Sequence, residues 1–224
     1  MKTKDQPLET NILNRIRRDS RINDAMIKVK VNNGLVVLTG IVSTYKKKLA
    51  VQLKANQTHG VLSVDNQIEV HYHREFGNPP DDMIKKTAAS ILAAASDIDD
   101  SKINLVLEAG VLTLRGSVTW YWQLHRVDEL VSNIIGVIDV KNELTVVPSE
   151  KISDEIIALE ITKELEHADH IDPSQILIEV KHGTVILSGT LRTYAAEQEA
   201  YDATIQQAGV TKIVKNITIA TPKA

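Results

Sequence analysis

The chain has 224 residues, of which 43% are hydrophobic and 25% are charged, and its formal net charge is −3. It contains no cysteine, which excludes disulfides, thiolate metal sites, cysteine nucleophiles and a lipid-modified N-terminal cysteine. The N-terminus lacks the apolar core of a signal peptide. The sequence as it stands therefore predicts a cytoplasmic protein, or a periplasmic one if a native signal is missing from it.

Charge is distributed unevenly along the chain. Residues 1–75 contain 13 Lys/Arg and 7 Asp/Glu, a net charge of +6, whereas residues 76–147 contain 6 and 10, a net charge of −4. The remaining residues contain 7 and 12, a net charge of −5. This asymmetry predicts either an anionic partner for the first third or attraction between successive parts of the chain.

A nine-residue segment recurs three times, as NNGLVVLTG (32–40), EAGVLTLRG (108–116) and KHGTVILSG (181–189). In each copy a first glycine is followed by a second after six residues and by a third after twenty-six. The nine glycines are Gly34, Gly40, Gly60, Gly110, Gly116, Gly136, Gly183, Gly189 and Gly209. Spacing this regular predicts one fold used three times.

Each copy begins with a predicted helix whose apolar residues recur every four positions. These residues are Leu8, Ile12 and Ile16, then Ile84, Ala88 and Leu92, then Ile157, Ile161 and Leu165. Ser153 followed by Asp154, and Pro80 followed by Asp81, are good helix starts because acidic residues suit the positive end of the helix dipole.

A β-hairpin follows this helix. Asn33-Gly34 is typical of a two-residue type I′ turn, which needs positive φ at both positions. Alternating apolar residues on both sides predict one buried face. The predicted cross-strand pairs are Val31 with Val36, Leu107 with Leu112 and Val180 with Val185. The second glycine is in phase with the buried face, so we interpret its missing side chain as allowing a covering helix to approach the sheet closely.

A second helix and a last strand complete each copy. The helix is predicted to run from about Thr44, Trp120 or Thr193 to the third glycine, which would act as a left-handed C-terminal cap. The last strands are predicted at 61–70, 137–146 and 210–220. The third carries one extra residue, which predicts a bulge or a slip in register.

These elements predict an α+β protein of three tandem α-β-β-α-β repeats, each a three-stranded sheet covered on one face by two helices. The predicted domains are residues 1–75, which are basic, residues 76–148, which are acidic and contain the tryptophans, and residues 149–224, which are acidic.

The pattern V-x-V-x-x-G-x-V-x-L-x-G-x-V, then a helix, then G-V-x-x-V-x-N, resembles the BON domain family of bacterial osmotically induced and nodulation proteins. The resemblance covers essentially the whole chain as three consecutive domains. In the first copy the matching residues are Val29, Val31, Gly34, Val36, Leu38, Gly40, Val42, Gly60, Val61, Val64 and Asn66. The resemblance implies a non-enzymatic envelope or stress protein that associates with phospholipid membranes or hydrophobic ligands.

Trp120 and Trp122 flank Tyr121 at the start of the second helix of the middle copy. Tyrosine recurs there in the other copies and is expected to be structural, whereas the tryptophans do not recur, so the fold does not require them. An aromatic cluster suits a membrane interface or a partner surface. The alternative is that the tryptophans fill a contact between repeats.

Lys46, Lys47 and Lys48 occupy the same helix start in the first copy, where the helix dipole disfavours cations. Near an anionic bilayer each would contribute about 1 kcal/mol. We expect the arginines of the neighbouring helix to add to the same field; these are Arg15, Arg17 and Arg18. The alternative is an ordinary solvated face. Nucleic acid is disfavoured, because the pI is about 6.2 and no GxxG loop or sheet-borne aromatic pair is present.

Signals for metal binding and catalysis are weak. The residues Asp97, Asp99, Ser101 and Glu108 mimic a calcium loop, but Lys102 stands where that loop needs glycine. Two histidine groups lack a further ligand; these are His71 with His73, and His167 with Asp169 and His170. No nucleophile–base or paired-carboxylate arrangement recurs, so we expect no metal, no cofactor and no enzymatic activity.

The predicted function is a peripheral binding module for anionic phospholipid surfaces or hydrophobic ligands in a stress or envelope-maintenance role. The alternative is a soluble scaffold that binds a protein partner through the aromatic residues. The oligomeric state is left open.

Overall fold

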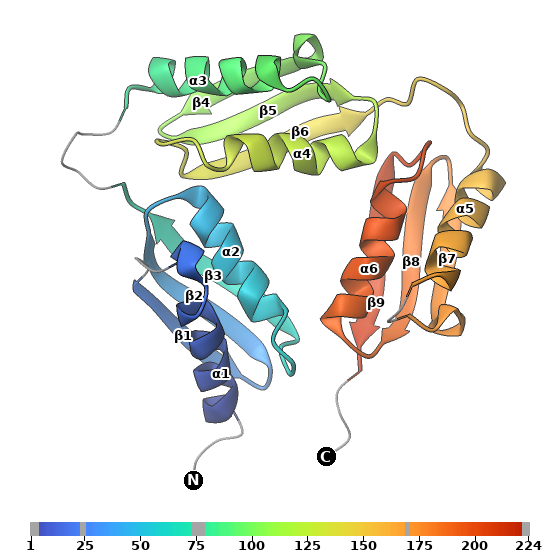
Figure 1. Cartoon of the computed structure of the whole chain (residues 1–224), viewed down its shortest axis with the longest axis horizontal. Coiled ribbons are helices and arrows are strands. Elements are labelled where there is room, and N and C mark those ends of the chain that lie inside the picture. Colours follow the sequence, from blue (N-terminus) through green and yellow to red (C-terminus); the bar gives the residue numbers. More distant parts are fainter. Residues whose placement is uncertain (1–4, 23–25, 73–78, 169–170, 221–224) are drawn as a thin grey trace. The chain divides into compact units, whose positions relative to one another are not determined.

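The computed structural model describes residues 5–22, 26–72, 79–168 and 171–220. Three α-β-β-α-β repeats follow one another along these residues (Figure 1), which confirms the predicted fold class. Contacts between Cα atoms divide the chain into two compact units, and the division runs through the second repeat. One unit comprises residues 1–91, 105–113 and 129–141, and the other comprises 92–104, 114–128 and 142–224. The repeat boundaries given by the sequence stay a prediction.

The first repeat has β2 at the centre of its sheet, antiparallel to β1 and parallel to β3. Its elements are α1 (Asp5–Arg17), β1 (Met26–Asn32), β2 (Leu35–Val42), α2 (Tyr45–Asn56) and β3 (Ser63–Val70). Parallel strands need a crossover connection, which α2 provides. Figure 1 shows α1 and α2 across the same face of this sheet.

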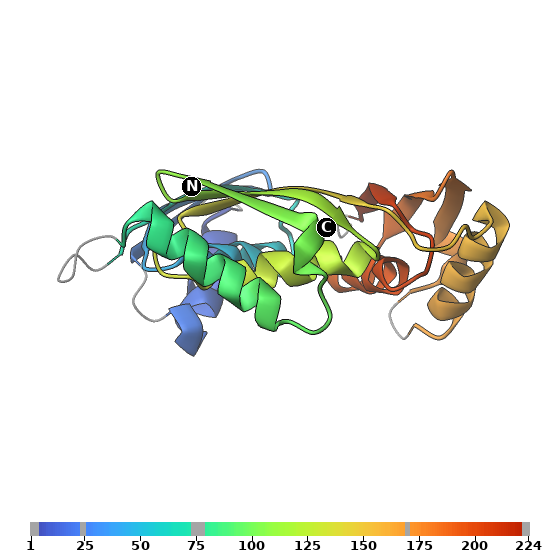
Figure 2. The ribbon, with the colours of Figure 1, turned by 90° about the horizontal axis from the view of Figure 1, so that it is seen from above.

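The other two repeats have the same element order, and their sheets are ordered β4-β5-β6 and β7-β8-β9. The second contains α3 (Asp81–Ala94), β4 (Ile103–Glu108), β5 (Val111–Val118), α4 (Tyr121–Val131) and β6 (Asp139–Val146). The third contains α5 (Asp154–Glu166), β7 (Ile176–Lys181), β8 (Thr184–Leu191), α6 (Tyr194–Ile205) and β9 (Lys212–Ile219). Figure 2 shows α5 and α6 together on one side of the third sheet.

The core of each repeat lies between its helices and its sheet. In the first repeat, buried Ile12 and Ile16 of α1 pack with Leu38 of β2 and Val51 of α2. Burying each such side chain stabilises the fold by about 1.5–3 kcal/mol. The third repeat builds the same core from Ile157, Ile161, Leu165, Val185, Leu187 and Leu191. The predicted four-residue helix period is thus confirmed.

The hairpins have the predicted two-residue turns. Asn33 and Gly34 have φ values of 49° and 81°, as a type I′ turn requires. The predicted pairs Val31 with Val36 and Val180 with Val185 are confirmed.

The interpretation of the second glycine is wrong. Gly40 has φ +134°, and a Cβ on it would lie 1.9 Å from the carbonyl oxygen of Met26 on the neighbouring strand. Gly116 and Gly189 meet the carbonyls of Lys102 and Gln175 in the same way. The second glycine is therefore required by its own positive φ and by a backbone carbonyl at, or directly before, the start of the adjacent strand, and not by a covering helix.

The predicted end of the second helix is also wrong. α2 ends at Asn56 with Gln57 as its C-cap in the right-handed region. Gly60, with φ +93°, lies in the turn that follows and not at the cap position. Six residues, 57–62, connect the end of α2 to β3.

The last strand of the third repeat contains neither a bulge nor a slip. β8 and β9 pair without interruption from Thr184 with Lys212 to Leu191 with Ile219, the register of Leu35 with Ser63 in the first repeat. The asparagine of the family pattern is displaced by one position, and Lys215 occupies the place of Asn66.

That place links the last strand to the second helix. Asn66 Nδ2 donates to the Lys48 carbonyl at 3.2 Å and to Gln52 Oε1 at 3.0 Å. Asn142 makes the same pair of bonds to the Leu124 carbonyl and Asp128 Oδ1. In the third repeat, Lys215 Nζ instead donates to Glu197 Oε1 at 2.8 Å, so an ion pair replaces the amide link.

Candidate functional site

A basic groove lies between the C-terminal ends of α1 and α2 in the first repeat. Its pocket, of about 330 Å³, is lined by Arg15, Arg18, Asp19, Ser20 and Lys54. Arg15 lies in the last turn of α1, Arg18 directly follows this helix, and Lys54 belongs to the last turn of α2. Three cationic side chains therefore converge on one hollow.

The single carboxylate in this groove is already neutralised within the chain. Asp19 accepts hydrogen bonds from Arg21 Nε at 2.8 Å and Arg21 Nη2 at 2.6 Å, and these bonds hold the pKa of Asp19 well below its usual range. Lys54 Nζ lies 3.4 Å from Asp19 Oδ2. Arg15 and Arg18 are exposed, so the groove keeps positive charge with which to bind an anion.

The second repeat has an apolar pocket between its two helices, and two of its positions correspond to Arg15 and Lys54 of the basic groove. A pocket of about 440 Å³ between α3 and the end of α4 is lined by Met83, Ile84, Ile91, Leu130, Ile134 and Ile135, with Pro79, Thr87 and Asn133. Ile91 and Leu130 stand at the same distances from Gly110 as Arg15 and Lys54 do from Gly34. Met83 and Ile135 are 61% and 63% exposed, an arrangement that suits an apolar ligand.

In the third repeat, the corresponding positions are Glu164 and Ala203. The two positions that are basic in the first repeat are therefore apolar in the second and hold a glutamate and an alanine in the third. Since the core and sheet register are shared, the fold does not impose these differences.

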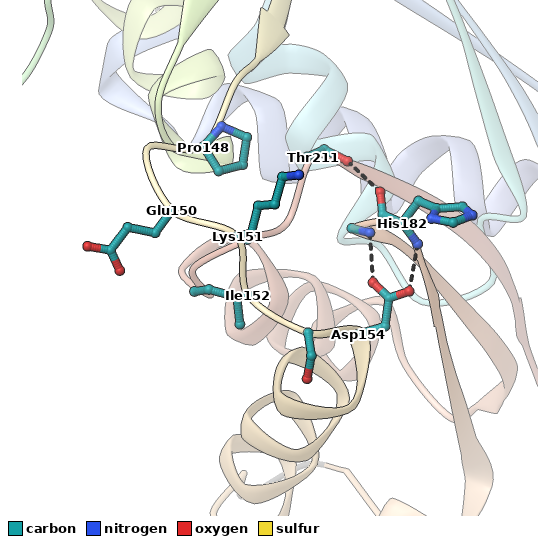
Figure 3. A pocket seen from close by; sticks show the side chains of 10 residues that line it. Pro148, Glu150, Lys151, Ile152, Asp154, His182 and Thr211 are labelled. Atoms are coloured by element: carbon teal, nitrogen blue, oxygen red, sulfur yellow. Dashed lines mark hydrogen bonds between the residues drawn. The ribbon is translucent and has the colours of Figure 1, made fainter.

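A further pocket, of about 530 Å³, lies beside the hairpin turn of the third repeat and is lined by Pro148, Lys151, Asp154, His182 and Thr211 among others (Figure 3). Asp154 Oδ2 accepts from the His182 amide at 2.7 Å, and Oδ1 accepts from the Gly183 amide at 2.9 Å. These bonds use the carboxylate to hold the hairpin against the start of α5. We therefore assign this pocket a structural role.

The structure separates the predicted basic residues into two places. Arg15 and Arg18 line the basic groove, and Arg17 is exposed on α1 outside its lining. Lys46, Lys47 and Lys48 lie at the other end of α2, about 9–12 Å along the helix from Lys54. The Lys46 amide donates to the Ser132 carbonyl at 3.0 Å, and Lys47 Nζ donates to Ser43 Oγ at 2.9 Å. The lysines and arginines were expected to form one basic surface, but they form two separate groups.

The aromatic segment at the start of α4 contacts other parts of the chain. Trp120 is 38% exposed and lines a pocket of about 160 Å³ with Pro148, Ala208 and Gly209. Tyr121 packs against the core cluster of the third repeat, and Trp122 is half-buried. Tyr121 therefore packs against another part of the chain, whereas Trp120 remains partly exposed to solvent.

A cluster of titratable side chains lies along α4. His125 Nε2 is hydrogen-bonded to Tyr201 Oη, with the two rings edge to face. Burial lowers the pKa of His125 and raises that of Tyr201. Burial also raises the pKa of Asp128 to about 6, although the hydrogen bond from Asn142 acts in the opposite direction. Sequence reasoning gave none of these groups a role.

Asp97 and Asp99, the first two acids of the calcium-like sequence, pair with other side chains. Arg126 Nε lies 3.0 Å from Asp97 Oδ2, and Asp99 accepts from Ser101 Oγ at 2.6 Å and pairs with Lys102 at 3.0 Å. In the described part of the chain, no group of three or more His, Asp or Glu side chains could hold a metal ion. His73, Asp169 and His170 lie outside the described residues. No helix among the described residues has the length and apolar character to span a membrane.

Sequence reasoning found Arg15 and Arg18 but missed the other groove residues, namely Lys54, Met83, Ile91, Leu130 and Ile135. A usable signal exists. The three copies can be aligned on their first glycine. The residues nineteen before it and twenty after it are then Arg15 and Lys54 in the first copy, Ile91 and Leu130 in the second, and Glu164 and Ala203 in the third.

No curated protein matches the chain. CdsD, a structural protein of the type III secretion system of Chlamydia trachomatis, is similar at 14% identity and a TM-score of 0.28, over 96% of this chain and 92% of that one. The C-terminal domain of CdsD is similar at 15% identity and a TM-score of 0.28, over 95% and 97%.

The family itself is shown by the sequence match, which covers the three repeats one by one. The BON domain model matches residues 4–72, 80–148 and 153–221. Since these segments make up most of the chain, the protein belongs to the BON domain family and carries three tandem copies.

Proposed function

We propose that this protein is a non-enzymatic binding module that attaches peripherally to anionic phospholipid surfaces. The basic groove of the first repeat would bind phosphate-bearing head groups, and the apolar groove of the second would accept an apolar chain. The observation that carries this proposal is the replacement of Arg15 and Lys54 by Ile91 and Leu130 at corresponding positions between the two helices. We place the activity in a stress or envelope-maintenance setting, as the resemblance to other BON proteins suggests.

Simple electrostatics supports the first part of the proposal. Each Lys or Arg near an anionic bilayer contributes about 1 kcal/mol, and the attraction decays over a Debye length of about 8 Å at physiological salt. The groove arginines are exposed on a repeat of net charge +6. Two groove cations would thus strengthen binding by about 2 kcal/mol, about thirtyfold, at low salt.

The test is flotation of the full chain with liposomes of graded anionic content at low and at physiological salt. The variant Arg15→Ile with Arg18→Ala removes the two exposed groove arginines and gives the first repeat the corresponding residues of the second, Ile91 and Ala94. It should lose about thirtyfold in affinity at low salt and much less at physiological salt. The matched control, Lys46→Gln with Lys48→Gln, removes the same charge at the other end of α2 and should have a smaller effect.

The apolar groove is tested by Met83→Ser with Ile135→Ser. Both side chains are largely exposed, so the fold should keep its stability. Binding should weaken at both salt concentrations, because apolar burial is not screened by ions. Failure of the unmodified protein to float with any liposome would contradict the proposal and favour the protein-binding scaffold.

A further inference from the structure

The sheet of the first repeat has one face that its helices leave uncovered. The exposed side of the central strand β2 carries Leu35, Val37, Thr39 and Ile41, with Leu35 51% and Ile41 42% exposed. Met26, paired with Ile41 across β1 and β2, is 78% exposed. An apolar stripe therefore runs the length of this open face.

The other repeats lack this stripe. Val37 and Ile41 correspond to Thr113 and Ser117 in the second repeat, where Arg115 on the same face pairs with Glu143 across the sheet at 2.8 Å. In the third repeat, Leu35 and Ile41 correspond to threonines. The fold does not require an apolar open face, so the shared fold does not explain the exposed apolar residues of the first repeat.

Charges of opposite sign border the stripe. Lys28 and Lys30 are exposed on β1, whereas Asp65 and Glu69 are exposed on β3. The register places Lys30, Val37 and Asp65 in one row across the sheet. Lys28 lies one row further along, beside Thr39. The face is thus basic along one edge, apolar in the middle and acidic along the other edge.

We propose that this face docks on the same face of a second copy of the chain, with the two-fold axis parallel to the strands. Rotation about such an axis exchanges the two edges, so β1 of each copy lies over β3 of the other. Lys30 then faces Asp65 of the second copy at the same height, twice in the dimer, and β2 packs on β2.

Charge selects this arrangement over the alternatives. A two-fold axis perpendicular to the strands would place Lys28 and Lys30 against themselves, and like charges across an interface oppose binding. An anionic membrane would attract one edge and repel the other. Sheets pack about 10 Å apart with nearly aligned strands, a distance that lysine and aspartate side chains can bridge. One strand of seven residues and two of eight cover about 14 by 26 Å, so the dimer is expected to be weak.

Sedimentation velocity of the full chain from about 10 to 200 µM at low salt tests the proposal. The unmodified protein should shift from monomer to dimer over this range. The variants Lys28→Glu with Lys30→Glu, and Asp65→Lys with Glu69→Lys, should each stay monomeric. An equimolar mixture of the two should form a heterodimer, because an all-acidic face then meets an all-basic one.

Recovery in the mixture also shows that both variants are folded. As a matched control, Val37→Asp should abolish the dimer, and Thr113→Asp, at the same position of the second repeat, should leave it unchanged. The proposal is overturned if the unmodified protein is monomeric throughout, if the mixture fails to associate, or if Thr113→Asp acts like Val37→Asp. Binding of the unmodified protein to anionic liposomes that Val37→Asp abolishes, without dimerisation of the unmodified protein, would assign the face to lipid instead.

Discussion

Asp154, the first residue of α5, accepts a hydrogen bond from the backbone amide of Gly183 at 2.9 Å, and its other oxygen accepts from His182 at 2.7 Å. A helix start is thereby fixed to a hairpin turn 29 residues away. Asp81 makes one such contact with the Ala109 amide at 3.1 Å. The bonds from Gly183 and His182 lower the pKa of Asp154 from the ordinary value of 3.8.

This contact predicts a loss of stability in the variant Asp154→Asn. The amide group can accept only one of the two bonds, so the unfolding temperature near neutral pH should fall by about 2–4 °C. Because the folded pKa is lowered, the carboxylate stabilises the fold above pH 3.8 and ceases to do so as the pH falls through its folded value. The difference between variant and parent should therefore disappear in acid.

Thermal unfolding followed by circular dichroism against pH measures this effect. Glu155→Gln is the control, since it removes a charge from the same helical turn without touching the hairpin. Equal losses in the two variants would show that the helix dipole, and not the hairpin contact, explains the role of Asp154.

A second prediction concerns the buried carboxyl of Asp128. The pKa of Asp128 in the folded chain is raised to about 6. Its contribution to the free energy of unfolding is therefore fully present below the ordinary pKa of 3.8 and is lost as the pH rises through about 6. Asp128→Asn should stabilise the protein by about 2 kcal/mol at pH 8 and leave it unchanged near pH 4. The amide can still accept from Asn142, as Gln52 does from Asn66 in the first repeat.

Urea unfolding of parent and variant at these two pH values measures the difference. Equal stabilities at pH 8 would show that the folded chain holds the Asp128 charge without cost.

A third prediction separates two glycines with positive φ. In Gly40→Ala the new Cβ would meet the Met26 carbonyl at 1.9 Å, so the variant should lose at least about 3 kcal/mol or fail to fold. In Gly60→Ala the nearest atom is Leu8 Cδ2 at 3.5 Å, so only the backbone conformation opposes it, at about 1–2 kcal/mol. Denaturant midpoints give both values, and equal losses would refute the close contact with β1.

The tryptophans give a fourth prediction. Threonine caps the second helix in the other repeats, where Thr44 accepts from the Lys47 amide and Thr193 from the Ala196 amide. Trp120→Thr with Trp122→Ala should gain a cap worth about 1 kcal/mol, which offsets lost apolar contact. The unfolding temperature should change by only a few degrees, whereas binding to liposomes should weaken at every salt concentration. A large drop in unfolding temperature would instead make both tryptophans structural.

The fold was predictable because short-range sequence patterns specify its helices, strands and turns. The Asn33-Gly34 pair is enough to specify its turn. The four-residue spacing of Ile12 and Ile16 specifies a helix, and the two-residue spacing of Val29 and Val31 specifies a strand. The role of Gly40 was not predictable, because its close neighbour is a carbonyl on another strand, which spacing along the chain does not reveal.

The candidate site was predictable only in part. Arg15 was found as one of three arginines of the first helix, but its partner Lys54 lies 39 residues away on another helix. Their meeting depends on how α1 and α2 pack across the sheet. Lys215 shows a different limit, since the family asparagine one residue later suggested an insertion where the strand register shows none.

The mixed pairing of the sheet sets an order for folding during synthesis. β1 and β2 pair residues no more than 15 apart, such as Met26 with Ile41, whereas β2 and β3 pair residues 28 apart, such as Leu35 with Ser63. The hairpin can therefore form as it leaves the ribosome, and the sheet closes only when the last strand emerges. Each copy completes its sheet before the next hairpin is made, which protects three similar sequences from exchanging strands.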